Sequence, residues 1–256
     1  MDVMHERCAA LDIGKKDLKA CVRSPATGRS RSRREVVRTF VTTTAGLLEL
    51  RDWLVTEKVE QVAMESTGDY WRGAFYLLED VVPVMLVNPR HAKAVPGRKT
   101  DVSDAAWLCK LTECGLLRGS FVPPEPIRRL RDLTRYRTML GQERAREIAR
   151  LEKELEDATI KVTAVTSKTL GVSTRAMIES LIAGERDPDT LAGMALGRMR
   201  PKIDSLCEAL TGNFTEHHAF LCRLHLRHID ELDRDLDELG ARIEELMRPF
   251  PPSSPG

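Results

Sequence analysis

Short apolar runs separated by polar turns dominate the first hundred residues of the chain. Their length and their content of Val, Ile, Phe and Thr are typical of β-strands, and the segments between them carry apolar residues at helical spacing. The pattern predicts strands over Cys8–Ile13, Leu18–Arg23, Val36–Thr43, Val59–Met64 and Val81–Val87. It predicts helices over Ala45–Glu57, Tyr70–Glu79 and Asp101–Thr112.

The order of these elements predicts the fold class. Three meandering strands are followed by an alternation of strands and helices, which favours an antiparallel set of strands continued by a parallel pair. This mixed α/β order is typical of ribonuclease-H-like domains. We expect the domain to cover residues 1–122, because the run Phe121-Val-Pro-Pro-Glu-Pro interrupts the pattern.

From Ile127 onward the pattern is almost entirely helical, and we expect residues 127–248 to form a coiled-coil and linker region. Two seams alternate steps of three and four: Ile148, Leu151, Leu155, Ala158, Val162 and Val165, then Ile229, Leu232, Leu236, Leu239, Ile243 and Leu246. Such spacing is typical of a two-stranded coiled coil between two copies. An internal hairpin of the two helices explains it equally well, with His225 as a packed residue. Residues 249–256 are expected to form a disordered Pro/Ser tail.

Four acidic residues stand where strands are expected to end and a helix to begin. Asp12 and Glu65 each close an apolar run, and Asp101 and Asp104 lie three positions apart. Carboxylate oxygens are the hard ligands that Mg²⁺ prefers, and two such ions can hold both oxygens of a phosphodiester exchange. Taken singly, Asp12 and Glu65 also suit turns, Asp101 an N-cap, and Asp104 a first helical turn. The set of four favours a metal site.

Positive charge is concentrated in clusters although the formal net charge is only +1. We expect these clustered residues to contact phosphate backbones: Arg31, Arg33, Arg34, Arg90, Lys93, Arg98 and Lys99. Further arginines follow the first long helix, where a solvated face is the competing interpretation. Aromatic residues are 5% of the chain, too few for a base-stacking platform. No zinc finger or helix–turn–helix is recognisable, so sequence reading would need a guide RNA or a further domain.

Composition excludes several protein classes. A length of 256 residues permits one large core with an appendage, or two small domains. The six cysteines lack CxxC spacing, so we expect reduced thiols rather than a zinc site or disulfide framework. The amino terminus lacks a signal-peptide pattern, and the longest apolar run is too short to cross a bilayer. We therefore expect a soluble cytoplasmic protein without a membrane partner.

Four motifs together resemble the DEDD transposases of the insertion-sequence 110 family, whose N-terminal half is similar to the junction resolvase RuvC. The motifs are Leu11-Asp-Ile-Gly-Lys, Met64-Glu-Ser-Thr-Gly-Asp-Tyr-Trp, Val87-Asn-Pro and Lys99-Thr-Asp-Val-Ser-Asp-Ala. The resemblance implies that Asp12, Glu65, Asp101 and Asp104 bind Mg²⁺, or Mn²⁺ in its place, and act in catalysis. It also implies DNA and a bridge (guide) RNA as partners, and assembly into a homo-oligomer.

In that family the nucleophile is a serine in a separate C-terminal domain. Here the chain stops soon after Arg248-Pro-Phe, in Pro251-Pro-Ser-Ser-Pro-Gly. We therefore expect this serine domain to be absent, so that the chain would be incomplete as an enzyme alone. Either this is a shortened or frameshifted copy, or a partner supplies the serine. Two alternatives stay open: a non-catalytic remnant that binds nucleic acid and dimerises, and a RuvC-like nuclease that uses water.

Overall fold

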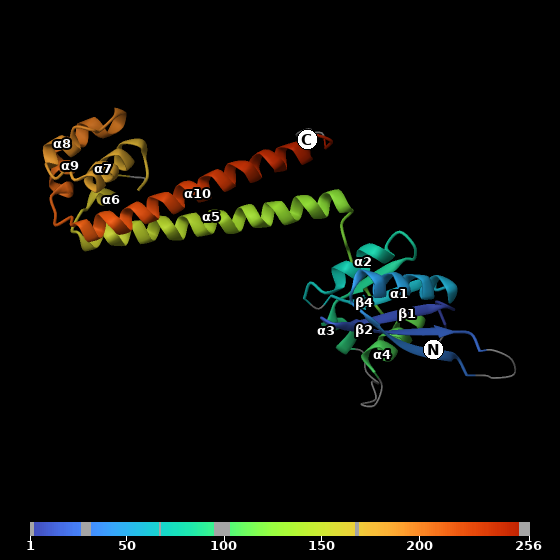
Figure 1. Cartoon of the computed structure of the whole chain (residues 1–256). Coiled ribbons are helices and arrows are strands. Elements are labelled where there is room, and N and C mark those ends of the chain that lie inside the picture. The colour runs from blue at the N-terminus through green and yellow to red at the C-terminus, as the bar shows by residue number, and fades with distance from the viewer. Residues whose placement is uncertain (1–2, 27–31, 67, 95–102, 167–168, 251–256) are drawn as a thin grey trace. The chain divides into compact units, whose positions relative to one another are not determined.

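The computed structural model describes residues 3–26, 32–66, 68–94, 103–166 and 169–250. The chain divides into two compact units, Met1–Val122 and Pro123–Gly256, and each is described by itself (Figure 1). In the described part of the chain, no helix is both long and apolar enough to cross a membrane.

The first unit is built on a mixed sheet of six strands. The strands are β1 (Cys8–Ile13), β2 (Asp17–Ser24), β3 (Arg34–Val41), β4 (Gln61–Glu65), β5 (Val84–Val87) and β6 (Gly119–Ser120), in the spatial order β3-β2-β1-β4-β5-β6. The pairs β1–β2, β2–β3 and β5–β6 are antiparallel, whereas β1–β4 and β4–β5 are parallel. The expected α/β, ribonuclease-H-like arrangement is confirmed.

Helices cover both faces of this sheet. They are α1 (Thr44–Thr56), α2 (Trp71–Leu78), α3 (Pro89–Ala94) and α4 (Asp104–Glu113). Leu50 of α1 and Phe75 of α2 pack with Leu11 of β1 on one face. Leu108 of α4 packs with Ala10 of β1 on the other face. Central strands buried on both faces therefore read as continuous apolar runs in the sequence.

Most expected elements of the first unit exist, with shifted ends. Strand β5 begins at Val84 rather than Val81, because the backbone N–H groups of Val81 and Val82 donate to the carbonyl of Leu78 and close a turn after α2. Two short elements were not predicted, α3 and β6. Strand β6 has only two exposed residues, so it has no apolar pattern to find.

The second unit consists of helices. They are α5 (Glu125–Asp157), α6 (Val162–Val165), α7 (Val172–Ala183), α8 (Pro188–Ala192), the 3-10 helix η1 (Gly197–Lys202), α9 (Ile203–Leu210) and α10 (Glu216–Met247). Figure 1 shows α5 and α10 lying along each other, with the shorter helices grouped at one end of the pair. The ion pair Arg144–Asp233 and the hydrogen-bond contact between Asp157 and His218 mark an antiparallel hairpin.

The first seam was wrongly predicted as one continuous helix over residues 148–165. Helix α5 ends at Asp157, Thr159 has a positive φ of 59°, and Val162 and Val165 belong to α6. The apolar rhythm survives the break because Leu155, Val162 and their neighbours share one buried core with α7 and α10. Residues 251–256 of the expected tail lie outside the described residues.

Candidate functional site

Asp12 and Glu65 end neighbouring parallel strands. The register between β1 and β4 pairs Leu11 with Met64, and Asp12 and Glu65 are the next residue on each strand. Adjacent strands lie about 4.8 Å apart, so the two backbones bring these acids side by side at the carboxyl edge of the sheet. Asp12 is exposed and Glu65 is half-buried, so both carboxylates remain within reach of solvent.

Strand alternation places both acids on the same face of the sheet. Cys8 and Ala10 on β1, and Ala63 on β4, pack in the core cluster that contains α4. Successive side chains point to opposite faces, so Asp12 and Glu65 share this side with Ala10 and Ala63. The two carboxylates therefore face the layer that holds α4.

Helix α4 runs antiparallel to β1, which brings its first residue toward the same edge. Near the carboxyl end of α4, the carbonyl of Glu113 accepts from the backbone N–H of Met4, just before β1, at 2.8 Å. At mid-helix, the sulfur atoms of Cys109 and Cys8 are 3.8 Å apart. The amino end, Asp104, therefore lies toward the carboxyl ends of β1 and β4.

A buried thiol contact fixes α4 on the sheet. The thiol of Cys8 donates to the carbonyl of Cys109 at 3.5 Å, and the thiol of Cys109 donates to the carbonyl of Cys8 at 3.4 Å. Burial raises the pKa of the Cys109 thiol well above its ordinary value, and hydrogen bonds with Cys21 and Cys8 raise it further. Because the thiolate is the reactive form, Cys109 serves packing here.

Helix α4 begins later than the sequence pattern suggested. Its N-cap is Ser103, whose hydroxyl accepts from the backbone N–H of Ala106 at 3.3 Å, and Asp104 is its first residue. The N-cap role considered for Asp101 is therefore filled by Ser103. Asp101, Arg31, Arg98 and Lys99 lie outside the described residues, as does the side chain of Lys93.

Asn88 and Arg90 extend the carboxyl edge beyond Glu65. Asn88 follows β5, and its side-chain oxygen accepts from the backbone N–H of Arg90 at 2.9 Å at the start of α3. The backbone N–H of Ser66 donates to the carbonyl of Val87 at 3.0 Å, which ties the loop after β4 to β5. Arg90 is exposed and lies two residues after Asn88, beyond the carboxyl end of β5.

Arg33 and Arg34 lie at the opposite edge of the sheet. Arg34 pairs with Ser24 in the β2–β3 register, beside the amino end of β1, and β1 spans about 13 Å from Cys8 to Asp12 at roughly 3.3 Å per residue. Arg33 Nε is 2.6 Å from buried Glu113. Arg34 forms a bidentate pair with Glu57 at 2.5 and 3.1 Å, and its hydrogen bond lowers the pKa of Glu57.

Three lysines that were not predicted as functional residues lie at the same edge of the sheet as Asp12. Lys19 is directly opposite Asp12 in the β1–β2 register, and Lys15 and Lys16 form the turn between these strands. All three are exposed. Directly opposed antiparallel residues share a face, with Cβ atoms about 5 Å apart. The run Gly14-Lys-Lys-Asp between the first two expected strands was the available signal.

The donor chemistry of this edge suits Mg²⁺, since every acid offers hard carboxylate oxygens near solvent. Among the described residues, however, no group of three or more His, Cys, Asp and Glu side chains is arranged to hold a metal ion. Asp12 and Glu65 are adjacent by register, and Asp104 is directed to the same edge by α4. The edge therefore supplies the chemistry of a metal site without a described three-ligand cluster.

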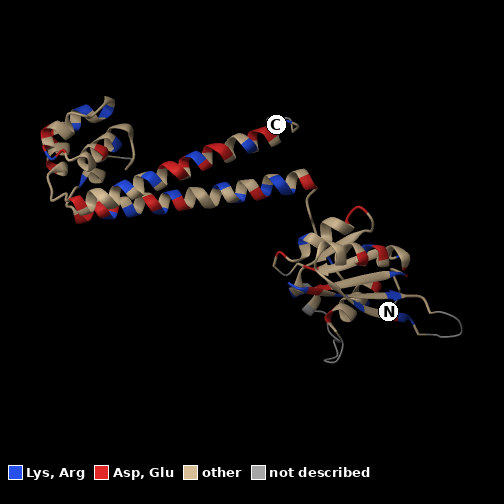
Figure 2. Cartoon of the chain, in the orientation of Figure 1, with Lys and Arg blue, Asp and Glu red and all other residues tan. Residues whose placement is uncertain are grey.

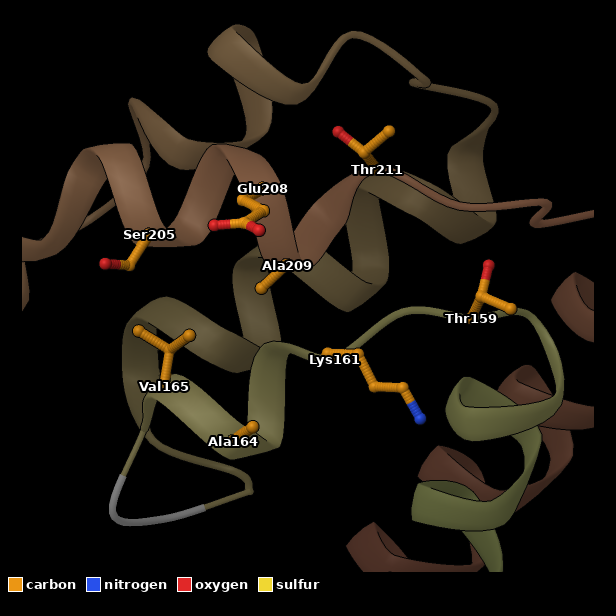
Figure 3. A pocket seen from close by; sticks show the side chains of 8 residues that line it. All are labelled: Thr159, Lys161, Ala164, Val165, Ser205, Glu208, Ala209 and Thr211. Carbon is orange, nitrogen blue, oxygen red and sulfur yellow. The ribbon is translucent and has the colours of Figure 1, made fainter.

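A hollow of about 380 Å³ in the second unit offers a different chemistry. It lies between the segment at Thr159–Val165 and α9, and Figure 3 shows Lys161 and Ser205 on its walls pointing in different directions. Lys161 forms an ion pair with Glu156, and Glu208 also lines the hollow. With its single cation already neutralised, this hollow is poorly suited to phosphate.

Comparisons with known proteins bear mainly on the first unit. The family model of DEDD transposases of insertion sequence 110, described as "Transposase", matches residues 9–160, more than half of the chain. No curated protein matches the chain. Among solved structures, the Aquifex aeolicus member of the Ppx/GppA family is 11% identical, covering 88% of this chain and 99% of its own, with a TM-score of 0.24. A TM-score this low supports no inference.

Proposed function

This chain belongs to the insertion-sequence 110 family of DEDD transposases, and from that premise we propose that the carboxyl edge of its sheet is the site of phosphodiester exchange in DNA transposition. One observation supports this assignment most. The β1–β4 register makes Asp12 and Glu65 neighbours on the face covered by α4, and α4 directs Asp104 to the same edge.

Asp12, Glu65, Asp104 and Asp101 would hold one or two Mg²⁺ ions, with Mn²⁺ as a substitute. A bound ion supplies Lewis-acid polarisation of a phosphoryl oxygen. The chain's own basic residues then orient the substrate. Lys15, Lys19 and Arg90 lie at this edge and would bind the phosphates next to the scissile bond, which fixes register without reading bases.

The other basic residues would contact DNA further from the scissile bond. Arg33 and Arg34 would have to share their guanidinium groups with Glu113 and Glu57 in order to bind DNA. We assign them to outlying backbone contacts. Arg31, Lys93, Arg98 and Lys99 complete the proposed contact set from positions whose side chains are not described.

We propose a guide RNA as the source of target specificity. Backbone contacts of the kind described here carry no sequence information. The family resemblance supplies the candidate, an RNA that pairs with donor and target DNA. The family also places its serine nucleophile in a separate domain, and we propose that this serine reaches the carboxylate edge from that domain or from a partner protein.

A second copy of the chain is the proposed partner of the helical hairpin. Leu236, Leu239, Ile243 and Leu246 continue the apolar seam of α10, yet they are only half-buried within the chain. Tyr136 and Met139 of α5 are 48% and 44% exposed. Covering these side chains with the same surface of another copy would complete the seam at coiled-coil spacing.

The test of the site uses a labelled four-way DNA junction incubated with Mg²⁺, the full chain and a serine-bearing domain of the family added as a separate protein. We expect strand cleavage or a covalent protein–DNA adduct, reduced at least about ten-fold in Asp12→Asn, Glu65→Gln and Asp104→Asn, because even groups that only support metal ligands cost roughly 10–100-fold when changed. Asp80→Asn, an exposed acid in the turn before β5, is the matched control. Equal activity in all variants would refute the assignment.

One alternative is a protein that binds nucleic acid without cleaving it. In that case the junction stays intact with Mg²⁺, and Asp12→Asn binds it as tightly as the unmodified chain. The form of the product separates the remaining candidates. A serine nucleophile leaves an adduct that resists denaturation, whereas a RuvC-like nuclease that uses water leaves only free DNA ends.

A further inference from the structure

Arginines make up half of the residues that line a groove between α7 and α10 in the second unit. Its volume is about 320 Å³, within the range of roughly 300–1,000 Å³ common for ligand sites. The lining residues are Arg175, Glu179, Ile182, Arg223, Leu226, Arg227, Asp230 and Arg234. Four arginines against two acids leave the groove with a net charge of +2. Figure 2 shows basic residues as blue bands along α10.

Helix geometry gathers these charges on one side of α10. Arg223, Arg227, Asp230 and Arg234 follow one another at steps of four, three and four, so they share one face of the helix. Ile178 of α7 and Ile229 of α10 belong to the same core cluster, which fixes the two walls of the groove against each other.

The two acids of the groove both accept hydrogen bonds from Arg175. Arg175 forms a bidentate pair with Asp230, at 2.5 and 2.7 Å, and its Nε donates to Glu179 at 2.7 Å. Hydrogen bonding from Arg175 holds the pKa of Asp230 below its ordinary value, so this pair stays ionised. Arg175 offsets one of the two acidic charges, and the other three arginines exceed the remaining one by two positive charges.

The remaining arginines have free donor capacity. Arg223 and Arg227 are exposed and form no ion pair or side-chain hydrogen bond with any described residue. Arg234 uses its Nε to donate to the carbonyl of Asp230 at 3.2 Å, which leaves its terminal nitrogens available. A planar guanidinium matches the oxygens of a phosphate in a two-point contact, so such a group of arginines suits phosphate better than a single carboxylate.

We propose that this groove binds the phosphodiester backbone of a nucleic acid, at a site separate from the carboxylate edge. Arg223 and Arg227 contact the phosphates, and Ile182 and Leu226 provide an apolar floor against the sugars. The lining contains no aromatic side chain for base stacking, so binding does not depend on base sequence. This site goes beyond the proposed function and uses none of its acids.

The test compares the full chain with the double variant Arg223→Gln/Arg227→Gln. A matched control, Arg242→Gln/Arg248→Gln, removes the same charge from exposed positions outside the groove. Binding of random-sequence double-stranded DNA and of single-stranded RNA is measured by fluorescence anisotropy at several salt concentrations. Circular dichroism checks that both variants fold, and the Mg²⁺ response of the junction assay reports separately on the carboxylate edge.

Loss of two phosphate contacts has a defined signature. For DNA, the slope of log affinity against log salt concentration should be shallower by about 2 in the groove variant than in the unmodified chain. Between roughly 50 and 200 mM salt, the unmodified chain should therefore lose about ten-fold more affinity than the groove variant. The control should keep the original slope. A loss confined to DNA or to RNA identifies which nucleic acid occupies the groove.

Unchanged affinity and slope for both nucleic acids in the groove variant would overturn the proposal. Poly-glutamate serves as a probe for an acidic protein partner. If the groove variant loses poly-glutamate binding while DNA and RNA binding are unchanged, the groove recognises an acidic protein surface and the proposal is wrong.

Discussion

Glu147 is a buried carboxylate on α5 that connects the two long helices through hydrogen bonds. Its side chain is 6% exposed, and Oε1 lies 2.7 Å from His225 Nδ1 and 3.4 Å from His228 Nδ1 of α10. Arg150 donates to Oε2 at 2.5 Å. Burial opposes ionisation of Glu147, but the hydrogen bonds from His225 and Arg150 outweigh it and hold the pKa below its ordinary value.

This cluster predicts a pH-dependent stability. Because the folded-state pKa of Glu147 is depressed, its contribution is present above the ordinary value near 4.5 and is lost as pH falls through the folded pKa. Glu147→Gln should lower the free energy of unfolding by about 1–3 kcal/mol at pH 7, in the range of hydrogen bonds to charged groups.

Thermal unfolding of both proteins across a pH series checks this expectation. The difference between them should disappear at the acidic end, below the ordinary pKa of a glutamate. Glu143→Gln on the same helix should stay within about 0.5 kcal/mol of the unmodified chain at every pH. A difference that persists unchanged into acid would show that Glu147 stabilises the hairpin by packing alone.

The positions of single residues could be predicted where the local sequence determines them, but not where the pairing of strands determines them. Asp12 and Glu65 each follow an apolar run, so their places at strand ends could be read directly. Arg33 and Arg34 are close to the first strands in sequence, yet the antiparallel turn of β2–β3 carries them to the opposite edge. Lys19, in contrast, is brought to the acids by strand pairing, because the β1–β2 register places it opposite Asp12.

At the scale of elements, α5 ends where the chain must turn into the cluster of short helices. Ala158 caps α5, and its carbonyl accepts from the backbone N–H of Asn213 at 2.8 Å. The backbone N–H of Lys161 donates to the carbonyl of Ala209 at 2.7 Å. These contacts bring residues more than forty positions apart into one tight crossing, with Gly212 at its centre.

A substitution at Gly212 should lower the free energy of unfolding, because a side chain there would disturb this crossing. A Cβ at Gly212 would lie 2.5 Å from the carbonyl oxygen of Ala158 and 2.8 Å from Ile160 Cδ1. Gly212→Ala should therefore destabilise the second unit by about 1–3 kcal/mol, the usual range for overpacking. Chemical denaturation followed by circular dichroism measures the change.

Gly240 is the matched control in the middle of α10. A Cβ there meets no described atom within 4 Å, and glycine inside a helix costs about 1 kcal/mol relative to alanine. Gly240→Ala should therefore stabilise the second unit by up to about 1 kcal/mol. Equal effects of the two substitutions would contradict this account of the crossing.

Periodicity predicted the elements better than their ends. The seam through Leu151 and Leu155 identified the correct buried face, but its rhythm continued through Ala158 although the helix stops there. No proline or glycine occupies that position; the break is fixed by long-range backbone hydrogen bonds and by the positive φ of Thr159. A local pattern contains no information about such contacts.

At the scale of the whole molecule, the buried apolar residues form separate cores in the two units. The sheet carries one cluster on each face, and a third cluster joins α5 to α10 through the shorter helices. Each unit therefore buries its own apolar surface, the usual condition for independent folding.

We expect fragments 1–122 and 123–256 to fold separately. Each should unfold in a cooperative thermal transition, with strong helical circular dichroism from the second fragment. A fragment that shows no transition while the full chain does would mean that its core depends on the other unit. Glu147→Gln should lower the melting temperature of fragment 123–256 as it does that of the second unit in the full chain, since its partners lie in that unit.

The central claim is that the acids at the carboxyl edge hold a divalent metal ion, and Mn²⁺ binding followed by electron paramagnetic resonance tests it without DNA, RNA or a nucleophile. The full chain and Asp80→Asn should bind one or two ions with equal affinity. Asp12→Asn and Glu65→Gln should bind at least about ten-fold more weakly, by the same reasoning on metal-site substitutions. If Asp12→Asn and Glu65→Gln bind Mn²⁺ as tightly as Asp80→Asn, the edge is not a metal site and the proposed chemistry is wrong.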